Sequence, residues 1–155
     1  MHKKPELLLP AGNTESFFAA LQAGADAVYL GLSQFNARAR ASNFSQFQFI
    51  SILKEAKKRK VLVYVTLNTV IKNAETGALI EYLHFLNEAG ADGIIVQDWG
   101  VYFIAQKYFP KLKIHASTQM GIHNSLGTEF LAEKGFQRTV LARELTLKEL
   151  ETVVI

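Results

Sequence analysis

The sequence predicts an α/β fold, a parallel (β/α) barrel of which this chain carries about six of the eight units. Short aliphatic runs alternate with amphipathic stretches along the whole chain, a pattern typical of βα units and a parallel sheet. A similar sequence recurs where a predicted helix ends and the next predicted strand begins. Polar residues follow the aliphatic runs, and barrels of this kind build their active sites at that end of the strands.

The aliphatic runs and the stretches between them give the expected elements in order. Strands are expected at 6–10, 26–31, 61–67, 92–97, 113–118 and 138–143. Helices are expected at 14–23, 45–58, 76–89, 100–108, 125–134 and 146–153. No linker interrupts the series, so residues 1–155 are expected to form a single domain.

An internal repeat supports this order. "ALQAGADAVYLG" at 20–31 and "FLNEAGADGIIVQD" at 85–98 both end a helix on glycine and enter a strand through Ala-Asp. "FLAEKGFQRTVLARE" at 130–144 is a looser third copy. Gly24, Gly90 and Gly135 therefore predict helix ends with positive φ, which glycine adopts readily.

A doubly wound sheet and a barrel both satisfy the alternation. The first turn, "PAGNTES", lacks the G-x-G-x-x-G fingerprint of a dinucleotide fold, which favours a TIM-like barrel. A complete barrel takes about 250 residues. The 155 residues are therefore expected to be the N-terminal part of a longer barrel domain. The first and sixth strands of this fragment would be open edges, so the fragment is expected either to self-associate or to occur only as part of a larger chain.

Composition excludes several classes of protein. The chain is 49% hydrophobic and 20% charged, as in a globular domain, and its net charge of +3 permits a polyanionic partner without indicating one. The lack of cysteine removes disulfides, thiol nucleophiles and thiolate metal sites. No apolar run approaches the roughly 18 residues of a membrane span, and the N-terminus lacks a signal peptide, so a cytoplasmic protein without membrane contact is expected.

The stretch "KIHASTQMGIHN" at 113–124 places polar residues along one side of a strand that otherwise reads as buried. His115, Ser117 and Gln119 alternate with Ile114 and Ala116. We expect this stripe to line the mouth of the barrel. The alternative is that His115 and Ser117 are hydrogen-bonded polar groups of the core.

The loop at 33–44, "SQFNARARASNF", is the most unusual connection. Asn36, Arg38, Arg40 and Asn43 present two guanidinium groups and two amides, which suit a phosphate, a carboxylate or the edge of a nucleobase. The alternative is a solvated loop whose arginine clamps a carboxylate at a strand end. The basic run "KEAKKRK" at 54–60 is instead expected to close a helix on the opposite face.

Motifs of the common catalytic kinds are missing. The chain contains no H-E-x-x-H, no G-x-S-x-G and no P-loop sequence, and its histidines show no metal-ligand spacing. Glu6, Asp98 and Glu144 are carboxylates suited to acid–base work. Asn13 is expected to cap the first helix, whose N-terminus also suits an anion.

Five blocks of the sequence resemble the N-terminal region of the peptidase U32 family, the collagenase-like proteases. They are "ELLLPAGNTESFFAALQAGADAVYLG", "FNARARASNF", "VYVTLNT", "IHASTQ" and "VLARELTLKEL". The resemblance implies a TIM-barrel-like catalytic domain. It also implies one of two activities: a peptidase of unknown catalytic type, or oxygen-independent hydroxylation of tRNA or rRNA pyrimidines or of ubiquinone, with prephenate implicated as oxygen source.

The hydroxylating relatives hold an iron–sulfur cluster with four cysteines after the block that matches "LARE". The resemblance therefore leaves two alternatives, a cluster in the portion after Ile155 or no cluster in this protein, and no cofactor or metal ligand is assigned to the chain itself. RNA, or a small carboxylate such as prephenate, is the expected partner. RNA hydroxylation is the leading hypothesis, a peptidase using Ser117 and His115 the second, and a non-catalytic binding or assembly module the third.

The matched blocks and the predicted strand ends select the same candidate residues. The expected catalytic residues are Asp98, His115 and Glu144. The expected substrate-binding residues are Glu6, Asn36, Arg38, Arg40, Asn43, Asn68, Ser117, Gln119 and Arg143.

Overall fold

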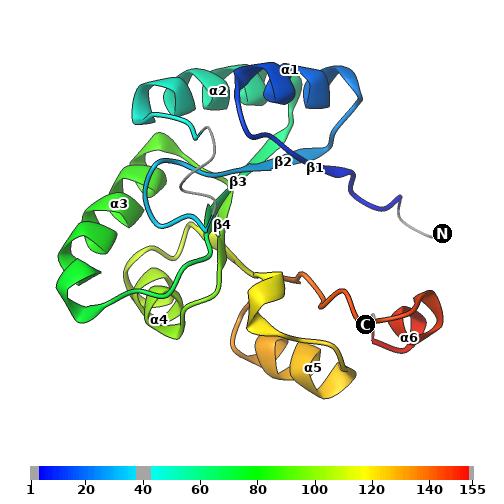
Figure 1. Cartoon of the computed structure of the whole chain (residues 1–155). Helices are drawn as coiled ribbons and strands as arrows, with labels where there is room; N and C mark the ends of the chain where they lie inside the picture. Colours follow the sequence, from blue (N-terminus) through cyan, green and yellow to red (C-terminus); the bar gives the residue numbers. More distant parts are fainter. Residues whose placement is uncertain (1–3, 38–42, 154–155) are drawn as a thin grey trace.

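Six parallel strands follow one another across a single curved sheet in the order of the chain (Figure 1). The strands are β1 (Leu8–Pro10), β2 (Ala27–Leu30), β3 (Leu62–Leu67), β4 (Gly93–Val96), β5 (Lys113–Ala116) and β6 (Arg138–Thr139). A doubly wound sheet reverses its strand order at a switch point, and no reversal occurs here. The sheet is therefore the curled half of a TIM-like barrel, as the sequence predicts. The computed structural model describes residues 4–37 and 43–153.

A helix follows each strand and lies outside the curve of the sheet (Figure 1). The helices are α1 (Thr14–Gln22), α2 (Gln46–Arg59), α3 (Thr76–Ala89), α4 (Trp99–Tyr108), α5 (Ser125–Glu133) and α6 (Leu147–Val153). Short 3₁₀ turns, η1 (Asn73–Glu75) and η2 (Thr118–Met120), stand in two of the connections. None of the helices in the described part of the chain has the length and hydrophobicity that a bilayer crossing requires.

Local sequence explains where the helices begin and end. Side chains of Asn13, Ser45 and Asn124 accept backbone N–H groups of the first turns of α1, α2 and α5. The repeated glycines Gly24, Gly90 and Gly135 have φ of 80°, 80° and 88°, which confirms the helix ends predicted from the repeat. The run at 54–60 closes α2, with Lys57, Lys58 and Arg59 in its last turn, where cations stabilise the dipole.

Alternation along the strands divides the apolar residues between two cores. Val63, Val65 and Leu67 belong to the large core, which also contains the buried residues of the helices. Tyr64 faces the other way and forms a small inner cluster with Ala27 and Ile95 on the concave side. The concave side is therefore the face on which polar groups can remain accessible.

All six strands are shorter than the sequence predicts, and β5 and β6 lose the most residues at their carboxyl ends. β6 covers only Arg138–Thr139 of the expected 138–143. β5 ends at Ala116, because the Ser117 hydroxyl accepts the N–H of Gln119, 3.3 Å away, and turns the chain into η2. Gln119 therefore lies in η2, beyond the end of the strand, and it lines the cavity described below.

Candidate functional site

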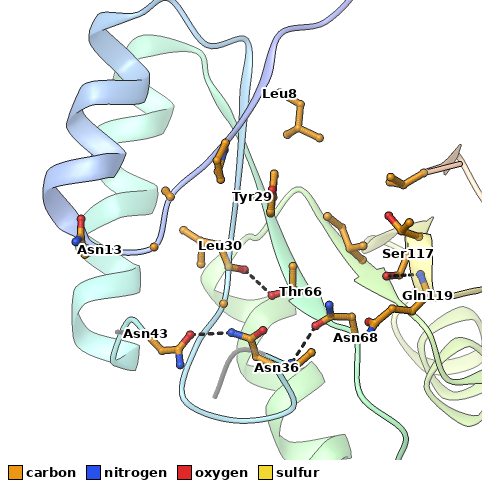
Figure 2. Close-up of a pocket in the computed structure, with 18 of the residues that line it drawn as sticks. Leu8, Asn13, Tyr29, Leu30, Asn36, Asn43, Thr66, Asn68, Ser117 and Gln119 are labelled. Atoms are coloured by element: carbon orange, nitrogen blue, oxygen red, sulfur yellow. Dashed lines mark hydrogen bonds between the residues drawn. The ribbon is translucent and has the colours of Figure 1, made fainter. Parts of the chain in front are cut away.

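A cavity of about 520 Å³ opens on the concave side of the sheet, at the carboxyl ends of the strands (Figure 2). This is the place where barrel enzymes bind substrate. Its polar lining comes from the loops after β1 and β2, from the ends of β3 and β5, and from the segment after β6. The polar and charged lining residues are Asn13, Asn36, Asn43, Thr66, Asn68, Ser117, Thr118, Gln119 and Arg143.

Three asparagines form one wall of this cavity (Figure 2). The Asn36 side-chain amide donates to Asn43 Oδ1 at 2.7 Å, and Asn68 Oδ1 accepts the backbone N–H of Ala37 at 3.2 Å. These bonds tie the loop after β2 to the end of β3. Asn36 is only 8% exposed, so its amide is held in place by its surroundings.

The backbone at the base of this loop is built around Asn36. A Cβ at Gly31 would overlap the Asn36 amide nitrogen and lie 2.6 Å from its Cγ, so the missing side chain makes room for Asn36. Phe35 adopts a positive φ of 56°, which costs a non-glycine residue about 1 kcal/mol. Its ring packs edge-on against buried Tyr82, with centroids 5.5 Å apart, and this contact offsets the cost.

Ser117, Gln119 and Arg143 line the same cavity from the strands farther along the sheet. Ser117 is buried, whereas Gln119 and Arg143 are exposed at its rim. Arg143 also borders an adjoining hollow, in which Glu144 lies with His123. The structure thus places Arg143 in the main cavity and Glu144 beside it.

The remaining wall is apolar, and the candidate set from the sequence does not include it. Leu8, Tyr29, Ile95 and Val140 line the cavity from β1, β2, β4 and the residue after β6. Tyr29 pairs with Tyr64 and Ile95 with His115 in the ladders, so both occupy inward positions, and the two-residue period of side chains along a strand was the signal that could have found them. Sequence reasoning favoured polar residues and passed over these.

His115 faces the concave side but does not line the cavity. Its ring is 2% exposed and packs edge-on against Tyr64, with centroids 4.4 Å apart. Its Nδ1 is buried and has no hydrogen-bond partner among the described residues. Burial lowers the pKa of His115 from its ordinary 6.5 to about 4, and the positive charge of Arg138 acts in the same direction. His115 is therefore a neutral residue of the inner core at pH 7.

Glu6 lies near the same layer, away from the cavity. Its carboxylate accepts a hydrogen bond from Arg138 at 2.7 Å, and this bond lowers the pKa of Glu6. The Arg138 guanidinium lies over the Tyr64 ring, 5.2 Å from its centroid. The pair joins the segment before β1 to β6, so its position points to a structural contribution.

The side-chain oxygens of Asp98 and Asn13 accept hydrogen bonds from backbone N–H groups. Asp98 Oδ1 accepts the N–H of Val101 as the N-cap of α4, and its Oδ2 accepts the N–H of Ile71. Asn13 accepts the N–H of Ser16, and the Ser16 hydroxyl accepts the N–H groups of Gly12 and Asn13. The capping box therefore uses N–H groups that an anion at the start of α1 would need.

The cavity thus brings together six of the twelve candidates: Asn36, Asn43, Asn68, Ser117, Gln119 and Arg143. Glu6, Asp98, His115 and Glu144 lie outside its lining. Arg38 and Arg40 lie outside the described residues. Within 4–37 and 43–153, no cluster of three His, Cys, Asp or Glu side chains is arranged to hold a metal ion.

Residues 12–154 match the sequence model of peptidase family U32. The chain belongs to peptidase family U32. The match confirms the resemblance read from the five sequence blocks, and the half-barrel agrees with the fold that this resemblance implies.

Several U32 relatives carry RNA-modification names. The chain is 38% identical to tRNA hydroxylation protein P1 of Bacillus subtilis over 96% of its own length and 35% of the relative. It is 36% identical to the 23S rRNA 5-hydroxycytidine C2501 synthase of Escherichia coli, over 96% of the chain and 22% of the relative. An uncharacterized protease of Methanocaldococcus jannaschii is 38% identical, over 96% of the chain and 36% of the relative. The chain spans about a fifth to a third of these relatives.

Solved structures support the fold. The U32 peptidase Mk0906 superposes with a TM-score of 0.76 over 99% of this chain and 66% of that chain, at 11% identity. A deoxyribose phosphate aldolase from Aeropyrum pernix superposes with a TM-score of 0.62 over 90% of this chain and 61% of that chain, at 18% identity. At such low identities these similarities bear on the barrel architecture alone.

Proposed function

We propose that the protein to which this U32 segment belongs hydroxylates a pyrimidine in tRNA or rRNA without molecular oxygen, and that the segment supplies part of the substrate site. The observation that carries the proposal is 34–38% identity, over nearly the whole chain, to proteins named for tRNA hydroxylation or rRNA hydroxycytidine synthesis. The cavity lined by carboxamides supports it, since amides present both donors and acceptors to the edge of a base.

In this proposal the residues of the chain bind and orient the substrate. The asparagine wall and Gln119 contact the base, and Arg143 at the rim contacts a phosphate. Arg143 is also the cationic side chain, among the described lining residues, that would bind a small carboxylate such as prephenate. Arg38 and Arg40 belong to the same loop in sequence and keep their expected role in binding an anion.

An iron–sulfur cluster does not fit the residues of this chain. The sequence has no cysteine, so it provides no thiolate for a cluster. We therefore derive no catalytic step through such a group from these residues. In the proposed enzyme the thiolates come from cysteines elsewhere in the protein.

The peptidase hypothesis gains no support from the Ser117 and His115 pair. The Ser117 hydroxyl accepts the N–H of Gln119, while the His115 ring packs against Tyr64 with its Nδ1 unpartnered. No hydrogen bond joins the two side chains in the described structure. A serine nucleophile needs a base within hydrogen-bond reach.

Nucleoside mass spectrometry tests the proposed function. Total tRNA and rRNA from cells with and without the full-length gene are digested and compared. We expect one pyrimidine nucleoside, heavier than its parent by one oxygen atom, to disappear with the gene and return with a plasmid copy. Identical nucleoside profiles in both strains would overturn the proposal.

A further inference from the structure

The cavity has two chemically different sides. Figure 2 shows Leu8 and Tyr29 on one side and Asn36, Asn43 and Asn68 along the other. Ile95 and Val140 add to the apolar lining, and Gln119 adds another carboxamide. A ligand that fits both sides has a hydrophobic face and a polar edge, as a flat heterocycle does.

Tyr29 is placed to meet the face of such a ring. It is half-buried, and it packs against the inner cluster of Ala27, Tyr64 and Ile95. In the β2–β3 ladder it stands directly opposite Tyr64, which is 2% exposed. The inner cluster therefore supports the Tyr29 side chain, so little conformational entropy is lost when a ligand stacks on it.

The carboxamide wall is equally fixed. Gly31 leaves the space in which the Asn36 amide lies, and the bond from the Ala37 N–H holds Asn68 by its Oδ1. Because Asn68 Oδ1 accepts this bond, the NH₂ group of Asn68 is the half of the amide that can donate to a ligand. Such a wall suits a carbonyl-bearing ring, because ring carbonyls accept from NH₂ groups and ring N–H groups donate to amide oxygens.

We infer that Tyr29 is the stacking residue of this cavity, which holds an uncharged, planar, amide-containing ring between Tyr29 and the carboxamide wall. The inference deepens the proposed function and rests on it for the choice of a pyrimidine. A neutral ring suits the described lining better than a multiply charged anion, because Arg143 is the cationic side chain that the described residues contribute and it lies exposed at the rim.

A pair of matched ligands separates stacking from edge recognition. Uridine and 5,6-dihydrouridine carry the same carbonyl and N–H edge, but the saturated ring of dihydrouridine is not planar and stacks poorly. We expect the full-length protein to bind uridine on the order of tenfold more tightly than dihydrouridine, measured by NMR titration. The ring proton of bound uridine nearest the glycosidic bond should shift upfield through the Tyr29 ring current.

Variants of Tyr29 identify the residue. In Tyr29→Phe the preference for uridine should persist, because the ring remains, and in Tyr29→Leu it should fall close to one. If Tyr29→Leu does not fold, the upfield shift of the uridine ring proton in the wild-type protein and in Tyr29→Phe still shows whether the base stacks on residue 29. Equal binding of the two nucleosides by the wild-type protein, or an unchanged preference in folded Tyr29→Leu, would overturn the inference.

The same titration distinguishes other occupants and keeps the inference apart from the proposed function. Inorganic phosphate or a dicarboxylate that displaces uridine from the wild-type protein and from Arg143→Ala alike would overturn the neutral-ring assignment. Stacking that depends on Tyr29, in a protein whose deletion leaves RNA unchanged, would uphold the inference and overturn only RNA hydroxylation. If the deletion strain lacks the hydroxylated nucleoside but the protein shows no preference for uridine over dihydrouridine, RNA hydroxylation would be upheld and the inference about Tyr29 overturned.

Discussion

At the scale of single residues, His115 shows how a polar side chain can belong to the core. It stands on the concave side of β5, as its alternation with Ile114 predicts, yet it packs against Tyr64 and does not line the cavity. The sequence left open whether His115 meets substrate or core. The depth of a residue along a barrel strand decides this, and depth depends on the register between strands, which no local pattern encodes.

The lowered pKa of His115 predicts a dependence of stability on pH. The folded protein resists protonation down to about pH 4, whereas the unfolded chain protonates near 6.5. The unfolded state therefore binds more protons between these values, so the free energy of unfolding falls as the pH drops from about 6.5 to about 4, by roughly 3 kcal/mol at most. Urea unfolding at pH 7 and pH 4.5 measures this difference.

Two variants isolate that contribution. His115→Phe keeps a ring against Tyr64 and should remove most of the difference between the two pH values. His84→Asn, at an exposed helix position, should leave it unchanged. Glu6 has a lowered pKa in the fold, so it also contributes to the loss of stability at low pH, but this contribution is common to wild type and His115→Phe and cancels in their comparison. An equal pH dependence in wild type and His115→Phe would contradict the assignment.

Gly31 makes a second prediction at this scale. Gly31→Ala places a Cβ where the Asn36 amide lies, and should reduce the free energy of unfolding by roughly 1–3 kcal/mol. The cost should shrink in an Asn36→Ala background, because the obstructing amide is gone. Gly12→Ala is the matched control in the same cavity, since no atom lies within 4 Å of its added Cβ. Calorimetric melting of wild type, the two single variants and the double variant, with Gly12→Ala as a fifth protein, tests the coupling, and additive losses would refute it.

At the scale of elements, the pattern of the sequence predicts all six strands and all six helices near their observed positions. Hydrophobic period, caps and glycine ends carry this information locally. The short β6 and the early end of β5 were not predicted. In β5 the reason is the hydroxyl of Ser117, which competes for a backbone N–H that a longer strand would have used in its ladder.

The site shows the same division between local and distant information. The carboxyl ends of the strands and the loop at 33–44 were identified because barrel geometry fixes which end carries the site. The apolar wall of Leu8, Tyr29 and Ile95 was not identified, because its function depends on which side chains of separate strands meet. Sequence alone also selected Asp98 for its charge, although its place before a helix equally indicated a cap.

The role of Asp98 as a cap gives a prediction at this scale. Asp98→Asn retains one acceptor oxygen for α4 and should lower stability by less than about 1 kcal/mol, whereas Asp98→Ala should cost roughly 1–3 kcal/mol. RNA hydroxylation by Asp98→Asn should stay close to wild type. A general base replaced by an amide would instead lose activity by orders of magnitude, and that result would restore Asp98 to the catalytic set.

At the scale of the whole molecule, the concave side of the sheet is partly bridged by Glu6 and Arg138. The pair joins residues 132 positions apart and is about 30% exposed at each side chain. β1 and β6 nevertheless each pair with one neighbour only in the described structure, whereas a closed barrel of this class has eight strands. Each therefore offers free backbone groups along one side.

We predict that the isolated 155-residue chain self-associates through these edges, around Leu7 to Leu9 or Val140 to Ala142. Multi-angle light scattering at increasing protein concentration measures the mass. We expect masses above that of the 17.3 kDa monomer. A soluble species that stays strictly monomeric at high concentration would show that the edges are protected.

The most direct measurement of the central claim is the hydroxylated nucleoside in RNA from a deletion strain that carries plasmid copies of the full-length gene. Wild type and Lys58→Ala should both restore it, since Lys58 lies exposed at the end of α2, outside the cavity. Asn68→Ala removes a carboxamide from the cavity wall and should lower the nucleoside on the order of tenfold at equal expression. Full restoration by Asn68→Ala, or loss of the nucleoside with Lys58→Ala, would contradict the account.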